Sequence, residues 1–208
     1  METTDTSAIN HWNELHRKYP IQIHLNDACY YAVWGTDMSD PEQQDQLLLD
    51  HEQRILLFTT GEQIAPWIIA GSARVFDADN LTAWANSLTD FTAEPVYDLD
   101  YMGSILRSDL RQEQILQNPN LTHEMIGFMN LYSDYAYPLD DEYLVGLHRK
   151  PQLRLFFDFC YDSYFWNTPE DELTRRQASY LKKFRFGKFK ADMLRMLTAF
   201  VDHCVVVP

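Results

Sequence analysis

The sequence predicts an α+β fold: a small, mostly antiparallel sheet in the first half with helices packed against it, and a largely helical second half. Two observations support this prediction. Up to residue 97, short runs rich in β-branched and aromatic residues alternate with helix-like segments, and beyond it apolar side chains recur at helical spacing. With 208 residues the chain can bury a sizeable core. We expect a single α+β domain over residues 1–208, with a subdivision near residue 98 as the alternative.

The first half supplies the expected strands. A helix over 7–19, stopped by Pro20, is expected to open the chain. IQIHL (21–25) and CYYAVWG (29–35) have the alternation and composition of strands, and the Asn-Asp pair between them favours a hairpin turn. The polar segment after the hairpin is expected to be a short helix or a solvated insertion. The other elements expected in this half are strands at 54–59 and 72–76 and helices at 60–71 and 79–88.

The second half is expected to be helical over 100–117 and 121–132, with Pro138 as a further interruption. LRLFFDFCYDSYFW (153–166) is the exception. Its alternation of leucine and phenylalanine at every second position from 153 to 159 predicts a strand. A threonine, a proline and three carboxylates at 168–172 then predict the start of another helix, since acidic side chains favour the first turn.

Charge is distributed unevenly along the chain. The formal net charge is −14, yet residues 173–208 hold eight basic and only two acidic residues. Residues 1–172 therefore hold 29 acidic against nine basic residues. Such an asymmetry predicts either a charged partner or compensation within the molecule.

The run KKFRFGKFK (182–190) has two interpretations. Lys and Arg neutralise phosphates and aromatic rings stack on bases, so a nucleic-acid site is one hypothesis, and a membrane surface is another. However, an acidic body repels a polyanion. Helical spacing instead predicts that the phenylalanines belong to the core while the basic residues face outward. The apolar residues at this spacing are Tyr180, Leu181 and Phe184 in one helix and Phe189, Met193, Met196, Leu197 and Phe200 in the next.

Several classes of protein lack support in the sequence. The N-terminal residues do not resemble a secretory signal and no apolar run is long enough for a membrane span, so we expect a cytoplasmic protein without a membrane. The three cysteines predict reduced, mostly buried thiols and no disulfide framework. No phosphate-binding glycine loop and no HExxH motif occurs. We therefore expect no cofactor, no metal and no nucleic acid, and we predict no catalytic residue.

What remains is a mixture of carboxylates with tyrosine, phenylalanine and tryptophan in DYAYPLDDEY (134–143) and DFCYDSYFWNTPEDE (158–172). Aromatic anchors within an acidic rim suit an interface with a basic protein, because aromatic side chains supply binding energy and charge speeds encounter. The alternative interpretation is that acidic loops only keep the protein in solution. The residues predicted to bind the partner are Tyr135, Tyr137, Asp140, Asp141, Glu142, Tyr143, Asp158 and Asp162.

The sequence thus predicts a non-enzymatic, acidic protein-binding module. In composition it resembles the immunity proteins with which bacteria neutralise cognate toxins, although no alignable stretch carries that resemblance. The resemblance implies a basic, toxin-like partner whose active cleft is occluded, with Asp140, Asp141 and Glu142 in place of phosphates and the neighbouring tyrosines as anchors. The alternative hypothesis is a carboxylate-based hydrolase that uses a divalent metal. The sequence does not predict the oligomeric state.

Overall fold

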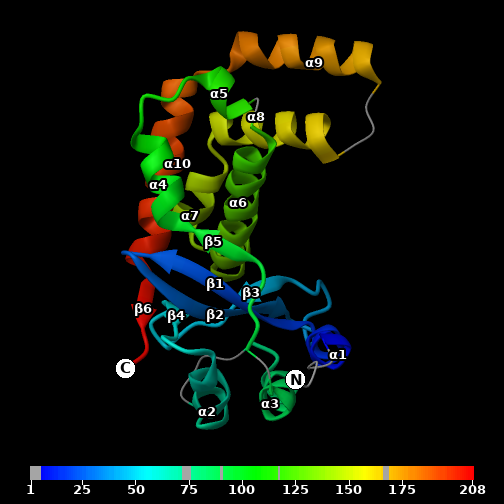
Figure 1. Cartoon of the computed structure of the whole chain (residues 1–208), viewed down its shortest axis with the longest axis vertical. Coiled ribbons are helices and arrows are strands. Elements are labelled where there is room, and N and C mark those ends of the chain that lie inside the picture. The colour runs from blue at the N-terminus through cyan, green and yellow to red at the C-terminus, as the bar shows by residue number, and fades with distance from the viewer. Residues whose placement is uncertain (1–5, 72–75, 90, 117, 166–168) are drawn as a thin grey trace, which may run out of the picture. The chain divides into compact units, whose positions relative to one another are not determined.

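The chain is α+β, as the sequence predicts, and divides into two compact units. The structure is a computed structural model that describes residues 6–71, 76–89, 91–116, 118–165 and 169–208. Unit 1 comprises Met1–Asp98 together with His203–Pro208, and unit 2 comprises Leu99–Asp202. Unit 1 contains the sheets and unit 2 is helical (Figure 1).

The predicted hairpin is confirmed and forms the centre of unit 1. Strands β1 (Lys18–Leu25) and β2 (Ala28–Thr36) pair antiparallel, with Leu25 opposite Ala28. Asn26 and Asp27 both adopt positive φ, of 54° and 59°. This is the conformation of the tight hairpin turn that matches strand twist, and Asn and Asp tolerate it better than most residues.

Two further strands complete this sheet within the described residues, in the order β3-β2-β1-β5. Strand β3 (Asp45–Leu47) pairs antiparallel with β2, so the polar segment after the hairpin adds an edge strand where a helix or a solvated insertion was predicted. Strand β5 (Val96–Asp98) pairs parallel with β1. A second, parallel pair joins β4 (Ile55–Leu57) to β6 (Cys204–Val206). Residues 72–75 of the strand predicted at 72–76 lie outside the described residues.

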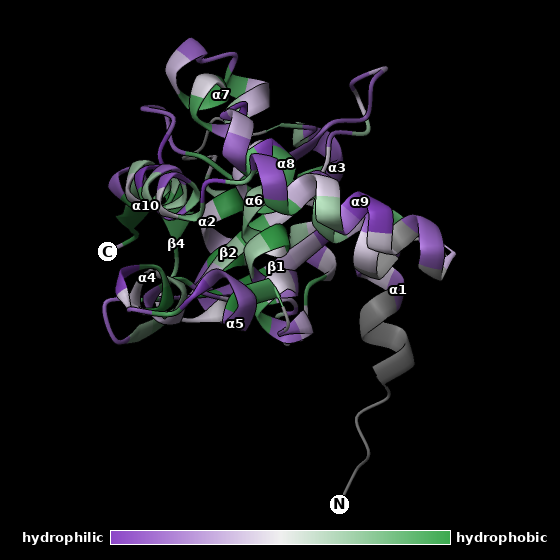
Figure 2. Cartoon of the chain, turned by 90° about the horizontal axis from the view of Figure 1, so that it is seen from above, coloured by the Kyte–Doolittle hydropathy of each residue, from purple (hydrophilic) through white to green (hydrophobic). Residues whose placement is uncertain are grey.

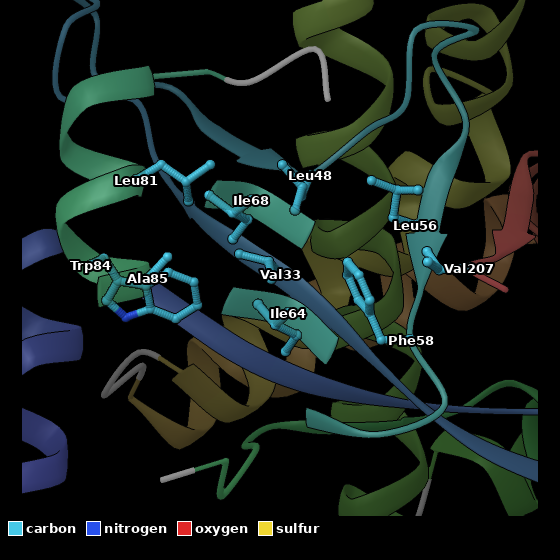
Figure 3. Close-up of a cluster of buried hydrophobic side chains, with 10 residues drawn as sticks. All are labelled: Val33, Leu48, Leu56, Phe58, Ile64, Ile68, Leu81, Trp84, Ala85 and Val207. Atoms are coloured by element: carbon cyan, nitrogen blue, oxygen red, sulfur yellow. The ribbon is translucent and has the colours of Figure 1, made fainter. Parts of the chain in front are cut away.

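Helices α2 (Ile64–Ile69) and α3 (Ala78–Ser87) pack together on one side of these strands (Figure 1). Side chains from both helices meet β2, β4 and the residues beside them in one buried cluster (Figure 3). A short 3-10 turn, η1 (Gly61–Gln63), precedes α2, and the Gln63 side chain accepts from the Thr60 N–H at 3.2 Å, as the capping pattern predicts. The cluster comprises Val33, Leu48, Leu56, Phe58, Ile64, Ile68, Leu81, Trp84, Ala85 and Val207.

The Lys18 side chain forms hydrogen bonds to three other segments of unit 1. Helix α1 (Thr6–His16) ends before the predicted boundary, because Arg17 adopts a positive φ of 50° and β1 begins at once. The Lys18 side chain is 0% exposed, and its ammonium donates to the carbonyls of His16 and Thr36 and to the Asp77 carboxylate at 2.9 Å. A buried ammonium with all three donors engaged is a structural feature, since an unpaired one would be very costly.

Unit 2 is built around the packed helices α6 (Pro119–Leu139), α8 (Pro151–Cys160) and α10 (Phe186–Asp202). Phe200 of α10 contacts Phe128 and Tyr135 of α6, with ring centroids 5.5 and 5.9 Å apart. Pro138 lies in the last turn of α6, so this helix continues well past the predicted end at 132 and stops one residue after the proline. The other helical elements of this unit are α4 (Leu99–Arg107), α5 (Gln112–Leu116), α7 (Glu142–His148), the π-helical turn η2 (Tyr161–Phe165) and α9 (Glu170–Lys183).

The predicted strand at 153–166 is wrong, because this segment forms α8 and η2. Leu153, Phe156, Phe159 and Cys160 are buried, at the three- and four-residue spacing of a helix, whereas Leu155 and Phe157 are only partly buried. Ten of the fourteen residues here are apolar or aromatic, so the sequence fits both the helical and the strand period. Packing of Phe156 against Phe189 of α10, at 4.5 Å between ring centroids, favours the helix.

The basic run joins α9 to α10. Phe184 and Phe189 are buried, while Lys182, Lys183 and Lys188 are exposed, as the core interpretation predicts. Leu181 differs from the prediction and is exposed. Helix α9 is largely hydrophilic (Figure 2), and Tyr180, stacked between two phenylalanines, is buried on it.

Candidate functional site

Four of the predicted partner-binding residues lie where α6 ends and α7 begins. We call Asp140, Asp141, Glu142 and Tyr143 the acidic turn; all four are exposed. Asp140 follows α6 in the left-handed conformation, with φ of 52°, and its N–H donates to the Tyr137 carbonyl at 3.0 Å. Aspartate is one of the few residues with a side chain that takes this conformation at modest cost, so the turn reverses the chain without a glycine.

Asp141 fixes the acidic turn as the N-cap of α7. One of its carboxylate oxygens accepts from the N–H groups of Tyr143 and Leu144, at 2.8 and 2.9 Å. The buried Tyr132 hydroxyl also donates to the carbonyl of Leu144, the residue that follows the acidic turn, at 3.1 Å. The backbone of the acidic turn is therefore held from both sides, and Asp141 has a structural task in addition to the predicted one.

The other side chains of the acidic turn point into solvent. Among the described residues, the carboxylates of Asp140 and Glu142 have no hydrogen-bond or ion-pair partner. Tyr143 is 66% exposed, more than any other large apolar side chain in the described part of the chain. The acidic turn thus presents an exposed aromatic ring and, within three residues of it, two carboxylates without a partner among the described residues.

Tyr135 is placed differently from its predicted role. It is 1% exposed and packs on Phe200 in the core of unit 2, so it cannot contact a partner. Tyr137, two residues further along α6, is 38% exposed. The sequence does not distinguish the two tyrosines, because they differ only in which side of α6 they occupy.

Tyr137 and Asp158 line a pocket of about 410 Å³ between α6, α7 and α8. The pocket combines apolar side chains with two guanidinium groups and an imidazole. Sequence reasoning missed this lining, because its histidine and two arginines come from the end of α7 and the first turn of α8 and meet only when the helices pack. The lining residues are Met129, Tyr137, His148, Arg149, Arg154, Phe157 and Asp158.

His148 forms one wall of this pocket. Its ring stacks on Tyr132 at 6.2 Å between centroids, and its Nδ1 lies 3.3 Å from the Tyr137 hydroxyl. Its Nε2 is buried and makes no hydrogen bond of ordinary geometry with a described residue. Burial, followed by the nearby Arg149 charge, lowers the pKa of His148, with the Met129 carbonyl opposing the shift. The imidazole is therefore neutral near pH 7.

The predicted acidic residues Asp158 and Asp162 each have a cation beside them. Asp158 lies 4.0 Å from Arg154 on the same helix. Asp162 accepts from Arg176 of α9 at 2.6 Å, and Arg176 also bridges to Glu172 at 2.5 Å. Both acidic residues border a smaller hollow of about 210 Å³ between α8 and α9. The structure thus places them apart from the acidic turn, in a surface of mixed charge.

The cysteines of the chain differ in their exposure. Cys160 is buried, as predicted, and burial raises the pKa of its thiol, so it stays protonated. Cys29 is exposed on β2. In the described part of the chain, no three His, Cys, Asp or Glu side chains are placed to hold a metal ion, and no helix is long and apolar enough to span a membrane.

The structure thus defines a protein with a small mixed sheet in one unit and a helical bundle in the other, with an exposed acidic turn on the bundle. No protein-family model matches the sequence, and no curated protein matches it either. Among solved structures, the chain is similar in fold to the C-terminal domain of SatS, whose crystal structure was determined in complex with bromine. The TM-score is 0.55 and the sequence identity 12%, over 96% of this chain and 99% of that chain.

Proposed function

We propose that this chain is a non-enzymatic binding module that engages a basic protein through the acidic turn. The observation that carries the proposal is Tyr143, which is 66% exposed and follows Asp140 and Glu142, whose carboxylates have no partner among the described residues. A tyrosine supplies a large contact area at low entropic cost, and its carboxylate neighbours select a cationic surface.

The fixed backbone of the acidic turn supports this role. The Asp141 cap and the Tyr132 hydrogen bond hold the turn before any partner arrives. Binding then orders few additional groups, which lowers its entropic cost. Loops without such support would offer the same residues at a larger cost.

Overall charge supports the proposal at longer range. Unit 1 holds 16 acidic and four basic residues, and unit 2 holds 15 acidic and 13 basic ones. A net charge of −14 favours encounter with a cationic protein and disfavours a polyanion. A more specific form of the proposal is that the partner is a toxin-like protein whose active cleft this chain covers, as immunity proteins do. This form rests on the amino-acid composition alone. The carboxylate-based hydrolase stays a prediction of the sequence.

A site-specific cross-link tests the proposal. A photoreactive benzoylphenylalanine replaces Tyr143 in the native cell, and a control chain carries it at Leu181, which is 48% exposed in the same unit. We expect one basic protein to cross-link from position 143 and not from position 181, identified by mass spectrometry. Cross-linking of the same partners from both positions, or of acidic proteins only, would contradict the proposal.

The purified partner then allows a quantitative test. Replacing Tyr143 with alanine should weaken binding about tenfold or more, as loss of an aromatic anchor does. Replacing Tyr101, which is 45% exposed in the same unit, with alanine is the matched control and should leave the affinity unchanged. Equal affinities for wild type and the Tyr143 variant would remove Tyr143 from the interface.

A further inference from the structure

The pocket between α6, α7 and α8 shares no residue with the acidic turn and has the opposite charge character. Its volume of about 410 Å³ falls within the usual range of small-molecule sites. Its apolar surface comes from Met129, Tyr137 and Phe157, and the Phe157 ring is itself held by stacking on Tyr161 at 4.4 Å. Such rings favour a flat, aromatic occupant, since offset stacking stabilises it.

The Arg149 guanidinium lies over the Tyr137 ring, and its N–H groups are available to a ligand. Its guanidinium lies 5.4 Å from the centre of the Tyr137 ring. Among the described residues it has no ion-pair partner, although carboxylates outnumber basic residues in the chain. A guanidinium stacked in this way is preorganised, and its outward N–H groups suit a carboxylate or phosphate.

Arg154 supplies a second guanidinium that is only loosely engaged. Its Nε lies 4.0 Å from the Asp158 carboxylate, and the two side chains are 81% and 60% exposed. An exposed ion pair at this distance is worth little, so Arg154 can turn toward an anion. With His148 neutral, two cations oppose one carboxylate in the lining, and the pocket has a net positive charge.

We propose that this pocket binds a small aromatic anion, with the ring against Tyr137 and Phe157 and the anionic group between Arg149 and Arg154. The His148 imidazole closes the pocket as a neutral polar wall, held by its contact with the Tyr137 hydroxyl. Asp158 disfavours the anion, so it limits affinity and confers selectivity against larger negative charge. The site is independent of the acidic turn and of any protein partner.

Titration by NMR tests the proposal with simple probes. Benzoate and phenyl phosphate carry the same aromatic ring but differ in the anionic group, so they show whether the pocket prefers a carboxylate or a phosphate. Benzylamine is the cationic control. We expect saturable shifts of the His148 imidazole and Tyr137 ring signals with at least one of the anions, at a Kd of about 1–10 mM, as for other fragments. Benzylamine should give none. No saturable shift with either anion up to about 20 mM, or equal shifts with benzylamine, would overturn the proposal.

Three substitutions sharpen the test. Arg149→Gln should weaken binding of the anion about tenfold, whereas Asp158→Asn should strengthen it severalfold because an opposing charge is removed. Arg111→Gln, an exposed arginine of the same unit outside the pocket, should have no effect. Amide spectra that match wild type away from the pocket establish that each variant is folded. Equal affinities for all three variants, or weakening by Asp158→Asn, would overturn the proposal.

Discussion

Asp141 and Tyr143 illustrate, at the residue scale, two roles that neighbouring residues have in one turn. Asp141 uses its carboxylate to hold the start of α7, while Tyr143 has no such task and extends into solvent. The sequence shows acidic and aromatic residues together, but it does not separate the one that shapes the turn from those available for binding. The N-cap pattern at Asp141 was the signal that could have separated them.

Replacing Asp141 with alanine should lower the free energy of unfolding by about 1–2 kcal/mol, because two backbone N–H groups lose their acceptor. Asp141→Asn should retain most of the stability, since asparagine is an equally good cap. Urea unfolding of the two variants gives the comparison. Glu142→Ala is the control, and a loss as large as that of Asp141→Ala would show that the cap is not the cause.

His148 should make stability depend on pH in a definite direction. Its pKa in the folded protein is below the ordinary value of 6.5, mainly because it is buried, so the unfolded chain takes up a proton more readily. The stability due to neutral His148 is thus complete above about pH 7 and is lost as the pH falls through 6.5 toward the folded pKa. Unfolding of wild type and His148→Gln between pH 7.5 and 5 should show a steeper loss for wild type. Parallel curves would contradict the lowered pKa.

At the scale of elements, the sequence predicted the turns and caps that depend on a few neighbouring residues. It did not predict the elements that depend on packing between distant segments. The Asn26–Asp27 hairpin and the capping pattern at Thr60 are confirmed, because turn and cap preferences act within a few residues. Strand β6 has no such local pattern and forms by pairing with β4, some 150 residues earlier in the chain. The pocket lining was also missed, since His148, Arg149 and Arg154 meet Tyr137 only through helix packing.

The misassigned segment 153–166 gives a test that separates a helix from a strand. In α8 Phe156 is 0% exposed and Leu155 is partly exposed, whereas the predicted strand would bury Leu155. Phe156→Ala should therefore lower the free energy of unfolding by about 3–5 kcal/mol, and Leu155→Ala by less than half of that. Denaturant unfolding checks the ranking. A reversed ranking would support the strand and contradict α8.

At the scale of the whole molecule, acidic charge is concentrated in unit 1 and nearly balanced in unit 2, where the acidic turn lies. In the proposed function, the field that attracts a basic partner and the contact that holds it therefore come from different parts of the chain. The field of the whole molecule and the local charge of the acidic turn should together determine how fast the partner arrives, and the acidic turn should also determine how long it stays and in which orientation. The basic run at the α9–α10 junction accounts for much of the balance within unit 2.

The central claim is tested most directly by the association rate between this chain and the purified partner that cross-linking identifies, measured at several ionic strengths. For wild type we predict a rate that falls at least tenfold between about 20 mM and 500 mM salt, as screening removes the attraction. The double variant Asp140→Lys, Glu142→Lys should associate about tenfold more slowly at low salt, with a flatter salt dependence. The matched variant Asp109→Lys, Glu113→Lys, with the same net charge, should lie close to wild type. Identical rates and salt dependences for all three proteins would contradict binding through the acidic turn.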